Sequence, residues 1–197
     1  MGYLVRKPDA FLREWKQNPD RNPLIIKGAR QVGKTETIRT FARENYKNVV
    51  EINFITEPAY KSIIDEGFST DHIIKLISRI DPTKHFVENE TLIFFDEIQD
   101  FPEIATALKF FKENAKYDVI CSGSLLGVQY QRIASISVGY KTDYQMYSMD
   151  FEEFLWAKGY SEEMVLDMLG HMLEGIAFSE AEHTILSNLF LEDCNLK

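Results

Sequence analysis

Residues 28–35 read Gly28-Ala29-Arg30-Gln31-Val32-Gly33-Lys34-Thr35. They fit the pattern G-x-x-x-x-G-K-[ST] of the phosphate-binding P-loop, with every fixed position filled. The apolar run in front of them, residues 23–26, predicts a buried parallel strand. Residues 36–43 carry apolar side chains at three- and four-residue spacing, which predicts an amphipathic helix. This setting favours a phosphate site over the alternative, a glycine-containing turn with an incidental Lys-Thr pair.

The loop and the start of the helix together form an anion site. The N–H groups of such a loop point inward, and a helix N-terminus carries partial positive charge. Gly28 and Gly33 let the backbone turn tightly and approach phosphate oxygens. Lys34 can reach the β- and γ-phosphates, and the Thr35 hydroxyl can ligand Mg²⁺. Because it can reach the phosphates that react, Lys34 is also predicted to be catalytic. The predicted nucleotide-binding residues are Gly28, Ala29, Arg30, Gln31, Val32, Gly33, Lys34, Thr35 and Glu36.

Two carboxylates follow a second apolar strand in residues 91–99, Thr91-Leu92-Ile93-Phe94-Phe95-Asp96-Glu97-Ile98-Gln99. This is the form of a Walker B strand. Asp96 at the strand end can bind Mg²⁺ through its water shell, and Glu97 can take a proton from the water that attacks the γ-phosphate. A pair of acids after a strand is often only a turn, but the complete P-loop before it favours the catalytic interpretation. The predicted metal ligands are Thr35 and Asp96.

A further buried strand is predicted at residues 117–124, and it ends in Ser122-Gly123-Ser124. In P-loop ATPases of the additional-strand type, this strand lies between the P-loop strand and the Walker B strand. Its polar tip can hydrogen-bond the attacking water or the γ-phosphate. Ser122 is the preferred catalytic candidate and Ser124 the second. The alternative is that Ser-Gly-Ser is a plain turn.

Helices are predicted after both of these strands. Residues 100–103 and 150–153 each fit a capping box, in which an N-cap side chain and an acidic side chain three residues later satisfy the first backbone N–H groups. The first box is expected to open a helix whose buried side carries Ile104, Leu108 and Phe111. The second should open an amphipathic helix that contains Phe151, Phe154, Leu155 and Ala157.

The last predicted helix, residues 180–192, has one apolar side made of Ile185, Leu186, Leu189 and Phe190. We expect part of this side to stay uncovered in a chain of this length. Exposed apolar patches of more than a few hundred Å² usually mark interaction surfaces. Self-association through the C-terminal helices, or the binding of an apolar dye there, is therefore predicted.

The 197 residues are 45% hydrophobic and 27% charged, as in an ordinary globular protein. The net charge of −9 comes from residues 150–197, which hold 11 acidic and 2 basic residues, whereas residues 1–149 hold 20 of each. Residues 1–47 have 11 basic against 5 acidic residues, which suits a polyphosphate ligand and would also suit nucleic acid. No motif supports nucleic acid, and the acidic end argues against contact of that end with DNA.

No membrane partner is predicted. Apolar runs stay well below the roughly 18 residues of a membrane helix, and the N-terminus lacks the apolar core of a signal peptide. Cys121 and Cys194 show neither metal-ligand nor redox spacing. A reducing cytoplasm is the simplest location.

Four stretches, residues 28–35, 91–99, 121–124 and 149–155, together resemble the prokaryotic AAA+-type ATPases. Members of that family read G-A-R-Q-V-G-K-T, F-D-E-I-Q, G-S and D-F-E-E-F-L in this order. The resemblance covers about residues 1–190. It implies an α/β, three-layer P-loop NTPase fold with a five-stranded, mostly parallel sheet in the additional-strand order, followed by a small C-terminal helical segment. It also implies hydrolysis of ATP with Mg²⁺.

The resemblance sets expectations for the domains and for one missing residue. Residues 1–157 should form the ATPase core and residues 158–197 the helical segment. Family members normally continue into a portion related to nuclease-like or winged-helix modules, which we expect to be missing here. Many relatives place Gly-Arg before the fifth strand, where this chain has Gly139-Tyr140-Lys141. That arginine cannot be assigned to Tyr140, so Arg132 and Lys141 are the candidates for the transition-state cation.

Three functions are consistent with these motifs. The leading one is an ATPase in which Lys34 and the loop amides hold the phosphates, Thr35 and Asp96 hold Mg²⁺ and Glu97 activates water. The second is an ATP-binding switch with little turnover, which acts through a partner or a nucleic-acid-related C-terminal module. The third, a small-molecule kinase, ranks last because the segments after Ser124 offer only Arg132 for an arginine-rich lid.

Overall fold

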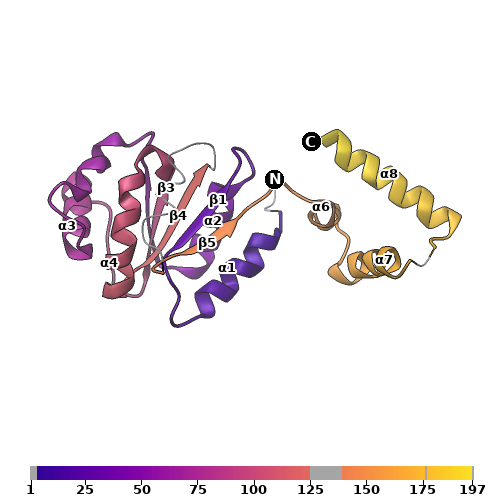
Figure 1. Cartoon of the computed structure of the whole chain (residues 1–197), viewed down its shortest axis with the longest axis horizontal. Coiled ribbons are helices and arrows are strands. Elements are labelled where there is room, and N and C mark those ends of the chain that lie inside the picture. The colour runs from indigo at the N-terminus through magenta and orange to yellow at the C-terminus, as the bar shows by residue number, and fades with distance from the viewer. Residues whose placement is uncertain (1–3, 125–138, 176, 197) are drawn as a thin grey trace. The chain divides into compact units, whose positions relative to one another are not determined.

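The computed structural model describes residues 4–124, 139–175 and 177–196 (Figure 1). The chain divides into two compact units. One, Phe11–Ser148, contains the β-sheet and is called here the sheet unit. The other combines Met1–Ala10 with Met149–Lys197 and is called the helical unit.

The sheet has five strands in the order β2-β3-β4-β1-β5, and every pairing in it is parallel. Its strands are β1 (Leu24–Gly28), β2 (Asn48–Asn53), β3 (Thr91–Asp96), β4 (Asp118–Ser124) and β5 (Thr142–Gln145). The predicted insertion of β4 between the P-loop strand β1 and the Walker B strand β3 is confirmed. Because the strands are parallel, their carboxyl ends meet at one edge of the sheet.

Helices cover both faces of the sheet. One face is covered by α1 (Lys7–Gln17) and α2 (Lys34–Asn45), and the other by α3 (Thr70–Ile80) and α4 (Ala107–Asn114). Short 3₁₀ segments precede the last two of these helices in the described chain. Segment η1 (Pro58–Ile64) lies between β2 and α3, and η2 (Ile98–Asp100) and η3 (Pro102–Thr106) lie between β3 and α4. The predicted three-layer α/β architecture is confirmed.

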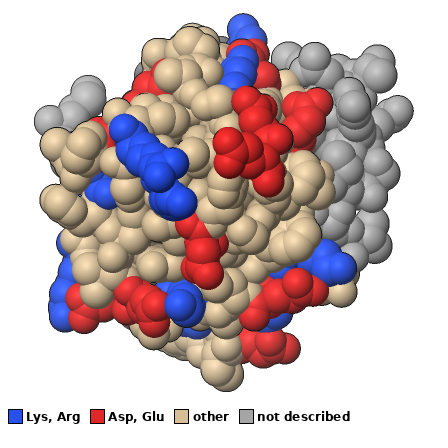
Figure 2. All heavy atoms as spheres, turned by 90° about the vertical axis from the view of Figure 1, so that its left-hand side faces the viewer, with Lys and Arg blue, Asp and Glu red and all other residues tan. Residues whose placement is uncertain are grey.

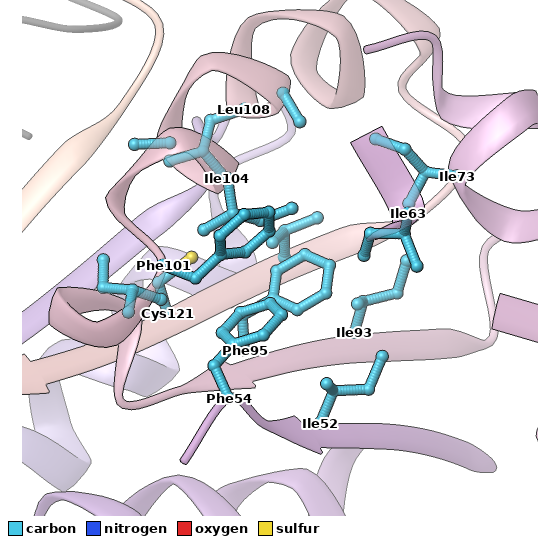
Figure 3. Packing of buried hydrophobic residues seen from close by; sticks show 14 of the residues in the cluster. Ile52, Phe54, Ile63, Ile73, Ile93, Phe95, Phe101, Ile104, Leu108 and Cys121 are labelled. Carbon is cyan, nitrogen blue, oxygen red and sulfur yellow. The ribbon is translucent and has the colours of Figure 1, made fainter. Parts of the chain in front are cut away.

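Strand β3 shows how the sequence builds two cores from one sheet. It is buried along its whole length, and successive side chains point to opposite faces. Leu92 and Phe94 pack with α1 and α2, whereas Ile93 and Phe95 pack with α3 and α4. On the second face the rings of Phe54, Phe95 and Phe101 cluster beneath Ile104 and Leu108 (Figure 3).

The capping box predicted at residues 100–103 is wrong. Phe101 precedes η3, and no side chain caps that segment. The Asp100 carboxylate lies 3.2 Å from the Lys61 ammonium instead of capping the backbone. Phe101 turns into the core, with its ring 4.9 Å from that of Phe54. The predicted burial of Ile104, Leu108 and Phe111 is confirmed.

The helical unit contains α6 (Phe151–Ala157), α7 (Glu162–Glu174) and α8 (Glu180–Leu196). The capping box predicted at Asp150 is confirmed, because Asp150 accepts from the Glu153 N–H at 2.9 Å and Glu153 accepts from the Asp150 N–H at 3.1 Å. Arg6 lies 3.0 Å from Glu153. This ion pair joins the N-terminal residues to α6. Because α6 packs with α7 and α8, the structure divides the chain at 148/149, whereas 157 was expected from the sequence.

The apolar side of α8 is only partly covered. Leu189 is 8% exposed, whereas Ile185 is 53% and Phe190 54% exposed. Phe190 and its neighbours line a cavity of about 430 Å³ within the helical unit. We expect the protein to bind the apolar dye ANS there, because exposed apolar surface of this kind adsorbs such dyes.

Phe190→Ser should lower the ANS fluorescence by about half or more, because it removes the exposed aromatic ring from the apolar side of α8. Val87→Ser, which removes an exposed apolar side chain from the sheet unit, is the control. Sedimentation of both variants tests the predicted self-association. A monomeric wild type without dye binding would contradict the prediction.

Candidate nucleotide-binding site

The loop between β1 and α2 contains two residues with a positive φ. Gly33 has a φ of +93°, a value that glycine adopts without strain, and Gln31 has a φ of +64°. No side chain caps the start of α2, which leaves this helix end suited to an anion. A Cβ on Gly28 would lie 2.3 Å from the Met146 carbonyl oxygen. Gly28 is therefore required for packing inside the protein, a role that its motif position does not predict.

Lys34 lies within the loop and is only 9% exposed. Its ammonium donates to the carbonyl oxygens of Gly28 at 3.1 Å and Ala29 at 2.7 Å. Burial lowers the pKa of Lys34, although the carboxylates of Glu97 and Asp96 act in the opposite direction. A buried ammonium bound only to neutral carbonyl oxygens gains from an anionic partner such as phosphate.

Asp96, at the end of β3, is bound by residues from three other elements. Its carboxylate accepts from the Ser122 hydroxyl, from Thr35 at 3.2 Å and from the Asn53 amide at 3.2 Å. Burial is the main reason why the pKa of Asp96 is raised, and the nearby Glu97 carboxylate adds to it. Thr35 and Asp96, the two predicted metal ligands, are thus brought together. Among the described residues, the hydrogen bonds that the structure gives to Asp96 come from neutral groups, and such a buried carboxylate suits a divalent cation.

Glu97 follows in a left-handed conformation, with a φ of +57°. Such a backbone is uncommon for a residue other than glycine, and it recurs at functional sites. Gln99 donates from its side-chain amide to the Glu97 carboxylate. The carbonyl oxygen of the same amide accepts from the Ser124 backbone N–H at 2.9 Å. The sequence analysis missed the roles of Gln99 and Asn53, and their position beside predicted site residues at strand ends was the only signal.

A cavity of about 570 Å³ collects most of the predicted site. It is lined by Arg30, Gln31, Gly33, Lys34, Thr35, Glu36, Arg39, Ile55, Glu97 and Ser124. Gly28, Ala29, Val32, Asp96 and Ser122, also predicted, do not line it. Arg39 and Ile55 line it although they were not predicted.

The two serines of β4 lie at different depths. Ser122 is opposite Ile26 in the sheet, is 1% exposed and bonds Asp96. Ser124 is opposite Gly28, where the P-loop begins, and lines the cavity. Ser124, the second candidate, therefore lies where a phosphate contact is available, and Ser122, the preferred one, lies behind Asp96.

Of the two candidates for the transition-state cation, Lys141 can be placed in the structure, and it does not line the cavity. Lys141 is 2.6 Å from the Asp143 carboxylate and is nearly buried there. Arg132 lies outside the described residues. Among the described residues, the cations that line the cavity are Arg30, Lys34 and Arg39, and the last is paired with Glu51 at 2.6 Å.

Residues 20–155 match the family model described as AAA domain, which spans more than half of the chain and includes the P-loop, β3 and β4. The chain belongs to the AAA domain family. The predicted AAA+-type P-loop ATPase family is thereby confirmed. A comparison with curated protein sequences returns no match.

The fold of the AAA domain resembles that of a solved structure, the Drosophila ORC structure bound to DNA. The match to the Drosophila ORC structure covers 76% of this chain and 44% of the ORC chain. Its TM-score is 0.50, and the sequence identity is 16%. The match to the C. elegans PCH-2 structure covers 88% of this chain and 47% of the PCH-2 chain. Its TM-score is 0.40, and the sequence identity is 12%. This chain thus spans less than half of the length of either protein chain. Within the described residues, no helix is both long and apolar enough to cross a membrane.

Proposed function

We propose that this AAA domain binds ATP and hydrolyses it to ADP and phosphate. One observation carries the proposal: Lys34, Thr35 and Glu97 line a single cavity at the carboxyl edge of the sheet. This is the edge at which open parallel sheets bind their ligands. The helix start and the loop amides supply an anion site in the same place.

Each residue has a separate task. Lys34 neutralises charge on the β- and γ-phosphates, and Ser124 is placed to hydrogen-bond the γ-phosphate or the attacking water. Glu97 accepts a proton from that water. At the same time the water oxygen bonds to the γ-phosphorus, and the bond between the γ-phosphorus and the bridging oxygen of ADP breaks. Thr35 and Asp96 would hold Mg²⁺, which supplies positive charge to the phosphates. Ser122 and Asn53 keep Asp96 in place through their hydrogen bonds.

The second candidate is an ATP-binding switch with little turnover, acting through a partner. It is favoured by the position of Lys141, which is paired with Asp143 and does not line the cavity. A steady-state ATPase assay separates the two functions, because a switch binds ATP without releasing phosphate at a comparable rate.

A nucleic-acid partner has less support. The ORC structure contains DNA, but most basic side chains of the first 47 residues here are paired with carboxylates, as with Lys16, Arg21, Lys27, Arg39, Arg43 and Lys47. Figure 2 shows basic and acidic residues interspersed on the face that includes α3. Paired charges of this kind do not form the basic stripe that binds a phosphate backbone.

Lys34→Ala tests the nucleotide site directly. It removes a charge-assisted contact to phosphate, which is worth about 1.5–3 kcal/mol, so the affinity for ATP with Mg²⁺ should fall about 10- to 150-fold. Isothermal titration calorimetry measures this loss. Chelation of Mg²⁺ should weaken binding to the wild type as well.

Lys75→Ala is the matched control, because Lys75 is an exposed lysine on α3 outside the cavity. Its ATP affinity should equal that of the wild type. Equal affinities for the wild type and Lys34→Ala would exclude the P-loop assignment.

A further inference from the structure

The side chain of Gln99 joins two parts of the site that the proposed mechanism treats as separate. Its amide nitrogen donates to the Glu97 carboxylate. Its amide oxygen accepts from the backbone N–H of Ser124, at the tip of β4. One side chain thus connects the proposed base to the strand end that lines the same cavity.

The carboxamide of Gln99 supplies both groups that these contacts need, a donor and an acceptor. The Ser124 N–H needs an acceptor, and the Glu97 carboxylate needs a donor. A glutamate at position 99 would keep the acceptor but place two carboxylates together, which is unfavourable. Glycine at 123 leaves room for the amide, because a Cβ there would lie 3.0 Å from the Gln99 amide oxygen and 3.2 Å from Ile98.

Glu97 needs such an anchor. Its side chain has three rotatable bonds and lines a cavity of about 570 Å³, where it is partly exposed. Gln99 binds Oε2 of Glu97. The other carboxylate oxygen is left to accept the proton of the attacking water. A general base must be held within hydrogen-bond reach of that proton.

We propose that Gln99 is a positioning residue that holds the Glu97 carboxylate in the orientation needed for hydrolysis. This inference rests on the proposed ATPase function. Gln99 does not line the cavity, so it acts on turnover and not on nucleotide binding.

Gln99→Ala should therefore lower kcat about 10- to 100-fold while KM for ATP changes less than about 2-fold, because a misplaced base slows only the chemical step. Gln99→Glu, of the same size, should be equally slow, because it keeps the contact to Ser124 but loses the donor to Glu97. Gln17→Ala and Gln17→Glu, at the exposed end of α1, are the matched controls and should keep the wild-type kcat.

A double-mutant cycle separates positioning from structural damage. If Gln99 acts through Glu97, adding Gln99→Ala to Glu97→Gln should cause no further loss of rate in single-turnover phosphate release. A general disturbance of the fold would instead multiply the two losses. Thermal unfolding of each variant identifies one that fails to fold, and Gln99→Glu then carries the test in place of Gln99→Ala.

The outcomes distinguish the two proposals. A wild type that hydrolyses ATP, with Gln99→Ala and Gln99→Glu within about 2-fold of its kcat, would overturn the positioning role alone. Multiplicative losses in the cycle would also overturn it. A wild type that binds ATP but releases no phosphate would remove the ATPase function and the role of Gln99 with it.

Discussion

Glu97→Gln is expected to bind ATP as tightly as the wild type and to hydrolyse it about 10²- to 10⁴-fold more slowly, the usual contribution of a positioned general base. The amide has the same size as the carboxylate and can still orient water, but it cannot accept a proton at neutral pH. Glu97 lines the cavity, and its carboxylate is held by Gln99. Single-turnover release of phosphate, together with calorimetric titration of ATP, measures the two effects separately.

The matched control for this prediction is Glu44→Gln, an exposed glutamate on α2 outside the cavity. It should have the wild-type rate. If the wild type hydrolyses ATP and Glu97→Gln does so equally fast, the base lies elsewhere. If the wild type binds ATP and releases no phosphate, the protein is better described as a switch.

The sheet could be predicted because its motifs are local in sequence. The P-loop fixes a strand, a loop and a helix within residues 24–45, and four apolar residues followed by Asp96 fix the next site strand. The order of the strands followed from the identity of these motifs and not from periodicity. Helix starts were less predictable, because Asp100 binds Lys61 and not the backbone.

Contacts that depend on strand register could not be predicted. Ser122 is preferred to Ser124 in the sequence analysis, but their partners Ile26 and Gly28 in the sheet place Ser124 beside the loop. Asn53 contacts Asp96 because the two residues are opposite each other in β2 and β3. Such positions follow from the pairing of strands far apart in the chain.

Gln99 illustrates a second limit. Its contacts require a left-handed backbone at Glu97 and the absence of a side chain at Gly123. The left-handed backbone at Glu97 has no signature in the sequence, and the sequence does not indicate that Gly123 lies beside Gln99. The boundary at 148/149 could not be predicted for a similar reason, because it depends on the packing of α6 with α7 and α8.

Asp118→Asn is expected to lower the free energy of unfolding by about 3 kcal/mol, because it weakens several charge-assisted hydrogen bonds that are each typically worth about 1.5–3 kcal/mol. Asp118, at the start of β4, accepts two hydrogen bonds from Arg21, one from Tyr46 at 2.7 Å and one from Lys16 at 3.0 Å. Its side chain is 15% exposed. The substitution leaves both cations without their anion, and the midpoint of thermal unfolding should fall by about 6–12 °C. Circular dichroism measures the shift, and Asp65→Asn, an exposed aspartate, is the control.

The same network predicts how this difference depends on pH. Burial raises the pKa of the Asp118 carboxyl, but the hydrogen bonds from Arg21, Tyr46 and Lys16 lower it by more, so its pKa lies below the ordinary 3.8. A carboxyl with a lower pKa in the folded chain stabilises the fold above its unfolded pKa, and this stabilisation is lost as the pH falls through the folded pKa. Urea unfolding should therefore give a constant difference between wild type and Asp118→Asn above about pH 5 and a shrinking one below about pH 4. A difference that stays unchanged at low pH would show that the charge of Asp118 does not stabilise the fold.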